Sequence, residues 1–398
     1  MQIPQEAIRA QNKVRYGIVG VGNIGSAHAS ALYGGKVEGA VLAALCDISP
    51  EVRRRCAENY PGVAVFGDAE ALFASDVDAV IISVPHPMHG RLAIRAFEMG
   101  KHVLTEKPMD IALSQGRKMA EAAQNSGKRF GIMFNQRTGN LFQKARELVQ
   151  SGALGQLKRS VWIITNWYRT QAYYNSGAWR ATWNGEGGGV LMNQCPHQLD
   201  LWQWICGMPS SVTAICEEGK YHNIEVEDNA TIFAKFPGGA DGVFITTTGE
   251  YPGTNRLEIS GSLGKLVLEN GTLKWWRLER DEREVCFDPT AESPKIPFTV
   301  EEFTQEKIQG HQAILQNFTN AVSFDEPLLA PGCDGLNQLA IQNAAYMSAW
   351  KGCTVQLPFD EGEYDALLAA RQREASRPAS GSAPMESRDY NPRWQIQW

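Results

Sequence analysis

The sequence has no apolar run long enough to cross a lipid bilayer. Its longest apolar stretches, such as AVIISVP at residues 79–85, have the length of a β-strand, whereas a transmembrane helix needs about 20 apolar residues. The N-terminal segment MQIPQEAIRAQNKVR contains no apolar core, so we expect no secretory signal there. These absences predict a soluble, cytoplasmic protein without membrane contacts.

Cysteine pairs with the spacing of metal-binding or redox motifs are also absent. The eight cysteines lie far apart and form no C-x-x-C pair, and Cys46, Cys206 and Cys353 lie in apolar runs. This distribution favours reduced, mostly buried thiols over a disulfide framework or a zinc site. The histidines do not cluster with thiolates or carboxylates along the chain, so we expect no bound metal.

An excess of positive charge is missing as well. The formal net charge is −6 and the basic residues are scattered, so nucleic acid is not an expected partner. Hydrophobic residues make up 43% and charged residues 21% of the 398 residues. Such a composition is typical of a globular protein, and this length is sufficient for two domains.

A glycine motif follows the first apolar run. The segment YGIVGVGNIGSAHASAL places Gly20, Gly22 and Gly25 in the pattern G-x-G-x-x-G, between a strand pattern and a helix pattern. In that context the glycines allow a tight turn and a close approach to a pyrophosphate, which the helix N-terminus attracts through its free N–H groups. We therefore predict a dinucleotide site that includes the backbone of Asn23 and Ile24.

The next strand pattern, VLAALCD, ends in Asp47, which lies 22 residues beyond Gly25. An acidic side chain at this position accepts hydrogen bonds from the adenosine ribose and repels a 2′-phosphate. The predicted cofactor is therefore NAD rather than NADP. Arg53 and Arg54 weaken this preference, because an arginine close by tolerates a 2′-phosphate.

Strand and helix patterns continue to alternate up to residue 136. This alternation predicts a Rossmann-type, doubly wound parallel sheet, whose ligands lie beyond the carboxyl ends of its strands. The expected elements are strands at 79–85, 102–108 and 129–135 and a helix at 113–126.

Polar residues follow these strands in an orderly way. The runs are Pro85-His86-Pro87 with His89, Glu106-Lys107-Pro108, and Asn135-Gln136-Arg137. Because the strand ends share one edge of the sheet, we expect contacts to the cofactor from Val84, Pro85, His89, Glu106, Lys107 and Asn135, and a contact to the substrate from Arg137. His86 and His89 could equally cap the following helix.

After Arg137 the alternation stops, and the remaining chain has a different pattern. One amphipathic helix at 141–150 precedes longer β-like runs that are joined by the glycine turns PGG and ENG. These turns favour hairpins. We therefore predict a mostly antiparallel sheet, with helices at 310–323 and 335–350 packing back onto it.

The expected division of the chain has four parts. They are an N-terminal extension at 1–12, a Rossmann domain at 13–136, a substrate-binding domain at 137–361 and a tail at 362–398. The tail is polar and rich in small residues, and its two tryptophans suggest docking on a neighbouring subunit.

The segment GGGVLMNQCPHQLDLW at residues 187–202 contains residues that helices disfavour. It begins with three glycines and places Pro196 beside His197, although these residue types cost about 1 and about 3 kcal/mol in a helix interior. This segment, the glycine motif and the E-K-P run occur in an order that resembles the Gfo/Idh/MocA family of sugar oxidoreductases over residues 13–360. The resemblance implies a homo-oligomer, either a dimer or a tetramer.

The resemblance also implies that Lys107 and His197 flank the reacting carbinol of the substrate. An imidazole that titrates near neutrality is suited to accept the hydroxyl proton, and a lysine stabilises negative charge on the oxygen. Many family members have an aspartate where this chain has Asn193. Because asparagine cannot ionise, His197 is expected to be the sole base, while Asp200 either orients it or faces solvent.

Two features of this segment allow alternative structures. The three glycines would let the backbone approach the cofactor or the sugar closely. Pro196 either bends a helix that already runs through Met192 or starts a new helix.

An aromatic loop precedes the three glycines. The run NWYRTQAYYNSGAWRATWNGE interleaves aromatic residues with two arginines, as expected for a surface that stacks on sugars and binds hydroxyls or carboxylates. The predicted substrate contacts of the second domain are Tyr168, Arg169, Tyr174, Trp179, Arg180, Asn193 and His197. A hydrophobic plug or an oligomer contact is the alternative.

Three functions remain open at this level. The first is an NAD-dependent dehydrogenase that oxidises a ring hydroxyl, with C3 the expected position, of a sugar, glycoside or cyclitol. The second is a glycoside hydrolase that oxidises C3 transiently and eliminates the aglycone, using Tyr168, Tyr173 or Tyr174 as a second acid/base. The third is a dinucleotide-binding protein without activity, suggested only by Asn193.

Overall fold

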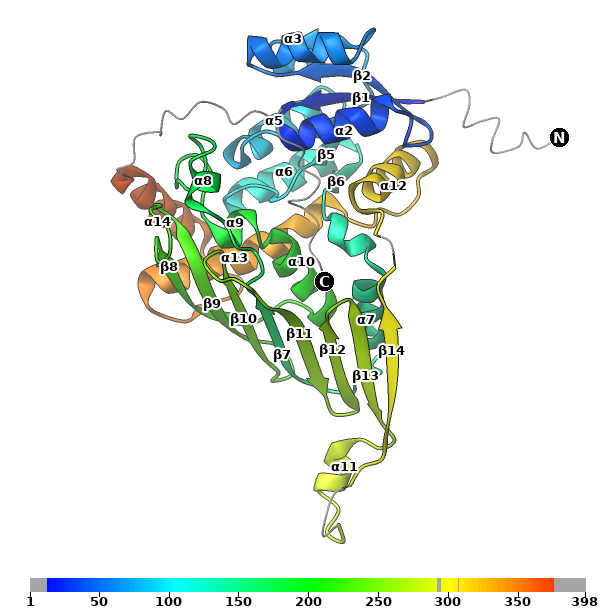
Figure 1. The fold of residues 1–398 in the computed structure, drawn as a ribbon, viewed down its shortest axis with the longest axis vertical. Coiled ribbons are helices and arrows are strands. Elements are labelled where there is room, and N and C mark those ends of the chain that lie inside the picture. Colours follow the sequence, from blue (N-terminus) through cyan, green and yellow to red (C-terminus); the bar gives the residue numbers. More distant parts are fainter. Residues whose placement is uncertain (1–12, 292–294, 307, 376–398) are drawn as a thin grey trace, which may run out of the picture. The chain divides into compact units, whose positions relative to one another are not determined.

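The structure is a computed structural model that describes residues 13–291, 295–306 and 308–375. These residues form two compact units (Figure 1). Among the described residues, the first unit comprises 13–138 and 309–339, and the second comprises 139–291, 295–306, 308 and 340–375. The expected extension at 1–12 and most of the expected tail, including its tryptophans, lie outside the described residues.

The sheet of the first unit is parallel and has the order β3-β2-β1-β4-β5-β6. This is the Rossmann strand order, and the predicted fold class is confirmed. The central strand β4 is buried along its whole length because helices cover both faces of such a sheet. The strands are β1 (Val14–Val19), β2 (Ala40–Cys46), β3 (Ala64–Phe66), β4 (Ala79–Ile82), β5 (His102–Thr105) and β6 (Phe130–Ile132).

The helices of the first unit follow the strands, as the alternation predicted. The helix expected at 113–126 is α6 (Leu113–Ser126), which ends at Gly127 in the left-handed conformation that glycine tolerates. The other elements are α2 (Asn23–Tyr33), α3 (Pro50–Asn59), α4 (Ala69–Phe73), α5 (His89–Glu98), η1 (His86–Met88), η2 (Asn135–Thr138) and η3 (Gly332–Asp334).

Helix α12 (Gly310–Phe324) belongs to the first unit, although the sequence suggested that it packs on the second sheet. Its Thr319 hydroxyl lies 2.8 Å from the hydroxyl of Tyr16 on β1, and its Phe318 ring contacts the Tyr16 ring at 6.4 Å between centroids. Sequence periodicity identifies the buried side of a helix but not the sheet that covers it, so this placement depends on tertiary contacts.

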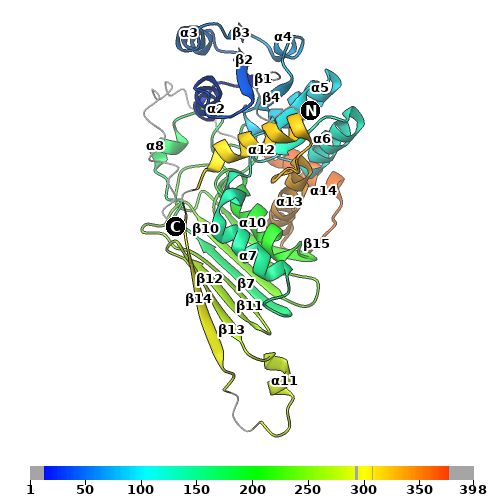
Figure 2. The ribbon, with the colours of Figure 1, turned by 90° about the vertical axis from the view of Figure 1, so that its right-hand side faces the viewer.

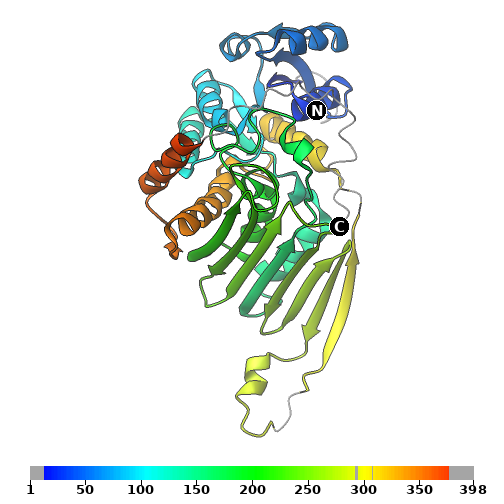
Figure 3. The same ribbon diagram turned by 60° about the vertical axis from the view of Figure 1, so that its left-hand side comes forward.

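The second unit is built on a nine-stranded sheet with the order β14-β13-β12-β11-β7-β10-β9-β8-β15 (Figure 3). Neighbouring strands are antiparallel except for β7 and β10, so the predicted mostly antiparallel sheet is confirmed. The strands are β7 (Leu157–Ile164), β8 (Ser211–Glu218), β9 (Glu227–Lys235), β10 (Asp241–Thr247), β11 (Asn255–Gly261), β12 (Gly264–Glu269), β13 (Thr272–Leu278), β14 (Phe298–Thr304) and β15 (Val355–Gln356).

Helices α7 and α10 pack together beside this sheet (Figure 2). Trp202 of α10 donates from Nε1 to the Ser160 hydroxyl of β7 at 2.9 Å, and its ring contacts Phe244 of β10. Alternating apolar residues of the strands therefore face these helices. The helices are α7 (Asn140–Gln150), α8 (Gln171–Tyr174), α9 (Val190–Asn193), α10 (Pro196–Cys206), α11 (Glu282–Cys286), α13 (Gly335–Lys351) and α14 (Glu361–Glu374).

The first part of the expected tail is ordered as helix α14. Asp360 caps its N-terminus by accepting from the N–H groups of Gly362 and Glu363. Tyr364 is fully buried and stacks on Trp350 of α13. The polar composition concealed this helix, because a few buried aromatic contacts hold it rather than a continuous apolar face.

Candidate active site

The glycine turn has the geometry that a dinucleotide requires. Gly20 has φ of 88°, and a Cβ on Gly25 would clash with the carbonyl of Gly20. A Cβ on Gly22 would meet no atom within 4 Å, so this glycine faces open space. Helix α2 begins directly after it without a side-chain cap, which leaves free N–H groups for a pyrophosphate. Asn23 and Ile24, predicted cofactor contacts, lie in the first turn of this helix.

Asp47 is fixed beside this turn. Its carboxylate accepts from the backbone N–H of Val21 and of Ser49, each at 2.9 Å. The guanidinium of Arg53 donates to the carbonyl oxygens of Asp47 and Ile48, while Arg54 pairs with Glu58 one helical turn away. Because both arginines are engaged, the carboxylate of Asp47 dominates this end of the site, which fits NAD.

Glu106 forms a buried hydrogen bond with a histidine that sequence reasoning missed. Its Oε1 lies 2.8 Å from Nε2 of His28 on α2, and both residues are buried. Burial acts to raise the pKa of Glu106, but His28, His311 and Lys107 together lower it to about 2. Burial lowers the pKa of His311 to about 4. The sequence signal for this contact was His28 itself, which lies three residues, or about one helical turn, after Gly25 on α2.

His89 lies between the end of β4 and the loop that carries Lys107. It is 1% exposed, and its ring nitrogens lie 2.8 Å from the carbonyl oxygens of Pro108 and Val84. Burial lowers its pKa, so the neutral ring has a single N–H and donates to one of these two carbonyls at a time. Val84 lies against the glycine turn, where a Cβ on Gly20 would touch it.

Arg137, a predicted substrate contact, is buried and bonded within the first unit. It is 1% exposed, and its guanidinium donates to Asp334 at 2.6 Å and to the carbonyl of Leu329 at 3.2 Å. The arginine therefore joins η2 to the returning segment of the first unit. Asn135 fits its predicted role better, since its Oδ1 is buried and accepts no hydrogen bond from any described residue.

Two of the three glycines of the second unit pack against protein, whereas the sequence suggested that all three approach the cofactor or the sugar. A Cβ on Gly188 would clash with the hydroxyl of Tyr346, and one on Gly189 would clash with the backbone of Glu227. The buried carboxyl of Glu227 accepts from the N–H groups of Gly189 and Leu191 at 2.9 Å and from the Tyr346 hydroxyl at 2.8 Å. Burial raises its pKa to about 8.

The proline starts a helix and does not bend one. Helix α9 ends at Asn193, and α10 begins with Pro196 at its first position, where proline is favoured. His197 follows directly and is 6% exposed. Asp200, one turn later, is fully buried and accepts from Gln203, so it does not face solvent.

Asn193 contacts a carboxylate that the sequence did not reveal. Its side-chain amide donates to Oε1 of Glu186, which is 2% exposed. The other oxygen of Glu186 accepts from the N–H of Ala181 at 2.6 Å. Glu186 therefore places a carboxyl group beside Asn193, whose own side chain cannot ionise.

The aromatic loop divides into structural and accessible residues. Tyr174 is 3% exposed, its hydroxyl lies 2.7 Å from that of Thr248, and burial raises its pKa, so the structure gives it a buried, structural position. Tyr173 is better placed, because its hydroxyl accepts from Arg180 at 2.9 Å and from Gln194 at 3.2 Å. Tyr168 is 46% exposed, and Arg180 stacks on Trp179.

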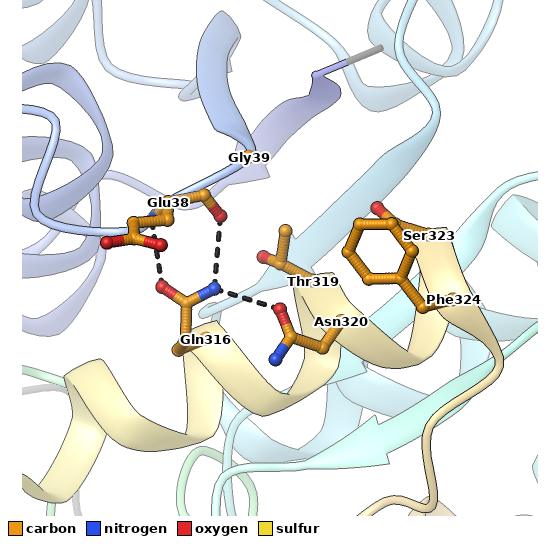
Figure 4. A pocket seen from close by; sticks show the side chains of 7 residues that line it. All are labelled: Glu38, Gly39, Gln316, Thr319, Asn320, Ser323 and Phe324. Carbon is orange, nitrogen blue, oxygen red and sulfur yellow. Dashed lines mark hydrogen bonds between the residues drawn. The ribbon is translucent and has the colours of Figure 1, made fainter. Parts of the chain in front are cut away.

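A shallow hollow in the first unit lies away from this chemistry (Figure 4). Its floor is the Gln316 side chain of α12, which exchanges hydrogen bonds with the backbone of Glu38. Glu38 precedes β2, so the hollow lies at the amino end of that strand and the glycine turn lies at the carboxyl end of β1. It is lined by Glu38, Gly39, Gln316, Thr319, Asn320, Ser323 and Phe324.

Within residues 13–291, 295–306 and 308–375, no group of three His, Cys, Asp or Glu side chains could hold a metal ion. No helix within them combines the length and the apolarity that crossing a membrane requires.

Family models match both halves of the chain. The model described as the oxidoreductase family with an NAD-binding Rossmann fold matches residues 14–134, and the GFO/IDH/MocA C-terminal domain matches 142–267. The chain belongs to the Gfo/Idh/MocA family. It is thus an NAD-binding oxidoreductase, and the residues around the glycine turn fit that cofactor.

Other members of the Gfo/Idh/MocA family resemble the chain over most of its length. Myo-inositol 2-dehydrogenase of Thermotoga maritima is 26% identical over 355 residues, which cover 86% of this chain and 98% of that protein. The WlbA dehydrogenase of Bordetella pertussis, solved with NADH and UDP-GlcNAcA, is 26% identical with a TM-score of 0.73, covering 88% of this chain and 100% of that one.

One similarity is local. Glycosyl hydrolase family 109 protein 1 of Shewanella sp. is 29% identical over 191 residues, which cover 45% of this chain and 41% of that protein.

Proposed function

We propose that the protein is an NAD-dependent dehydrogenase that oxidises a ring hydroxyl, at C3, of a sugar, glycoside or cyclitol. The observation that carries the proposal is His197 at the start of α10, in a unit whose relatives include an inositol dehydrogenase and a dehydrogenase bound to a sugar nucleotide. Lys107, directly after β5 in the NAD-binding unit, supports it.

The residues of the chain divide the reaction between them. NAD, when bound, supplies the acceptor for a hydride. His197 accepts the hydroxyl proton as general base, and the ammonium of Lys107 stabilises the negative charge that develops on the oxygen. Asn193 cannot take up the proton and instead orients a hydroxyl or the imidazole, held by its bond to Glu186.

The alternative is a glycoside hydrolase that oxidises C3 transiently and eliminates the aglycone. The local similarity to a family 109 glycosyl hydrolase favours it. Such a cycle needs a second acid/base, and Tyr173 is the best-placed tyrosine because its hydroxyl contacts Arg180 and Gln194. Tyr174 is excluded from this role by its burial and its bond to Thr248.

Purified protein mixed with NAD and a panel of sugars, cyclitols and glycosides distinguishes the two functions. NADH absorbance together with a product two hydrogens lighter by mass spectrometry is the result expected for the dehydrogenase. Released aglycone without net NADH would establish the hydrolase instead. If no compound yielded either NADH or free aglycone, both proposals would be contradicted.

A further inference from the structure

The run Asn166–Arg169 has a rigid backbone at the start of the aromatic loop. Arg169 donates from its backbone N–H to the carbonyl of Thr248 at 2.9 Å, and its own carbonyl lies 2.9 Å from Nε2 of His222. Nδ1 of His222 in turn contacts Asp228, which is fully buried. The backbone of Arg169 is therefore fixed by Thr248, which follows β10, and by His222, which is bonded to Asp228 of β9.

Two N–H donors of this run are buried without an acceptor among the described residues. They are Nε1 of Trp167 and Nε of Arg169. Both side chains lie on the same side of the run, since the guanidinium is 5.6 Å from the Trp167 ring. A buried donor without a partner costs about 1–3 kcal/mol, so such donors in a native protein call for an acceptor from outside the chain, which is an ordered water, an ion or a bound ligand.

The charge of Arg169 is also uncompensated in the described part of the chain. Its Nη1 donates only to the neighbouring carbonyl of Tyr168 at 3.0 Å, and the guanidinium stacks 5.0 Å from the Tyr173 ring. Arg180 stacks on the same ring at 4.7 Å but lies 3.9 Å from the carboxylate of Glu186. Arg180 therefore has a carboxylate within ion-pairing distance, whereas no described carboxylate pairs with Arg169.

This cluster is connected to the helix that carries His197. The hydroxyl of Tyr173 accepts from Gln194, which lies between α9 and α10. The Oε1 of Gln194 is itself buried and has no donor among the described residues. A ligand held by Arg169 would thus be positioned by the same loop that contacts the segment before His197.

We propose that the guanidinium of Arg169 and the indole N–H of Trp167 bind a carboxylate of the substrate. The substrate class is then a carboxylated sugar or cyclitol, such as a uronate. The inference rests on the proposed dehydrogenase function and narrows it. A planar guanidinium matches a carboxylate in two parallel hydrogen bonds, whereas a neutral hydroxyl would leave the charge of Arg169 uncompensated.

Matched ligand pairs test the proposal by calorimetric titration of the NAD-loaded protein. The pairs are D-glucuronate with D-glucose, and N-acetylglucosaminuronate with N-acetylglucosamine, which differ only in the carboxylate. We expect the charged member of at least one pair to bind at least tenfold more tightly, which corresponds to about 1.4 kcal/mol. Arg169→Gln should abolish the preference, and Trp167→Phe should reduce it while keeping the aromatic ring.

Arg159→Gln is the matched control, because Arg159 lies on β7 and pairs with Glu258 away from the loop. It should retain the wild-type preference, and circular dichroism should show that all variants fold. The proposal would be overturned if both members of every pair bound equally, or if the preference survived in Arg169→Gln. It would also be overturned if glucose 6-phosphate bound more tightly than glucuronate, or if no member of any pair bound. NADH formation from a neutral sugar without carboxylate preference would refute this inference alone, whereas carboxylate binding without NADH from any compound would refute only the dehydrogenase.

Discussion

At the scale of the residue, the proposed chemistry depends on a few side chains whose neighbours control their charge and position. Glu106 is kept ionised by His28 beside it, and His89 connects the strand ends next to Lys107. His197 lies at the start of α10, directly after a proline that fixes where this helix begins.

Replacing His197 or Lys107 by alanine should lower kcat at least about a hundredfold, the scale for losing a general base or a charge-stabilising group. NADH formation with the best substrate of the panel measures this effect. NAD binding by His197→Ala should stay near the wild-type value and serves as the control for folding. Near-normal turnover of either variant would remove that residue from the mechanism.

Asp47→Ala should reduce the preference for NAD over NADP. The substitution removes a charged acceptor, whose hydrogen bond contributes about 1.5–3 kcal/mol. The dissociation constant of NADPH divided by that of NADH should therefore fall roughly tenfold or more. Fluorescence titration with NADH and NADPH gives both constants. An unchanged ratio would transfer the selectivity to Arg53 and Arg54.

At the scale of the element, the short helix α9 is held by side chains that arrive from β9 and α13. Glu227 accepts from the backbone N–H groups of Gly189 and Leu191, and Tyr346 donates to Glu227. Gly188 and Gly189 are needed because a Cβ at either position would clash with Tyr346 or with the backbone of Glu227. Sequence reasoning recognised the glycines but could not identify what they pack against.

Glu227→Gln should change how stability depends on pH. The folded carboxyl has a pKa of about 8, above its ordinary 4.5, so between these values the folded state binds more protons than the unfolded state. Its contribution to stability is therefore fully present below pH about 4.5 and falls as the pH rises to about 8, by at most about 1.4 kcal/mol per unit. Urea unfolding at pH 5, 6.5 and 8 measures the slope, and identical slopes for wild type and variant would contradict the prediction.

Gly189→Ala and Gly22→Ala should separate folding from cofactor binding. The first Cβ meets the backbone of Glu227 and the second meets nothing within 4 Å, so the first should cost about 1–3 kcal/mol of stability and the second far less. Gly22→Ala should instead weaken NAD binding, since the added methyl group would occupy space beside the pyrophosphate. Thermal unfolding and NADH titration give the two readings, and a stable Gly189→Ala protein would show that the segment can shift.

At the scale of the whole molecule, the first unit is built from two segments that are separated in the sequence by most of the second unit. Residues Gln309–Leu339 rejoin the NAD-binding unit, and α12 packs on β1 there. The nine-stranded sheet has a face on which Ile215 and Phe233 of neighbouring strands are 58% and 49% exposed.

Light scattering should give a mass of two or four times 43.9 kDa, as the resemblance to oligomeric relatives implied. Phe233→Glu should lower this mass if the exposed sheet face forms the contact, because a charge desolvated in an apolar interface is unfavourable. Thr299→Glu, on the exposed strand β14, is a control of the same charge. A wild-type mass of 43.9 kDa would contradict the prediction.

The sequence by itself determined the Rossmann sheet, the antiparallel sheet and the glycine turn with Asp47, because these follow from local periodicity and from the rule that parallel strands share one ligand-binding edge. Tertiary structure alone decided which polar residues are available. Arg137 donates to Asp334, which lies 197 residues away along the chain. The N–H of Gly189 donates to Glu227, which lies 38 residues further along. Such pairs depend on how distant segments pack, and no pattern along the chain encodes them.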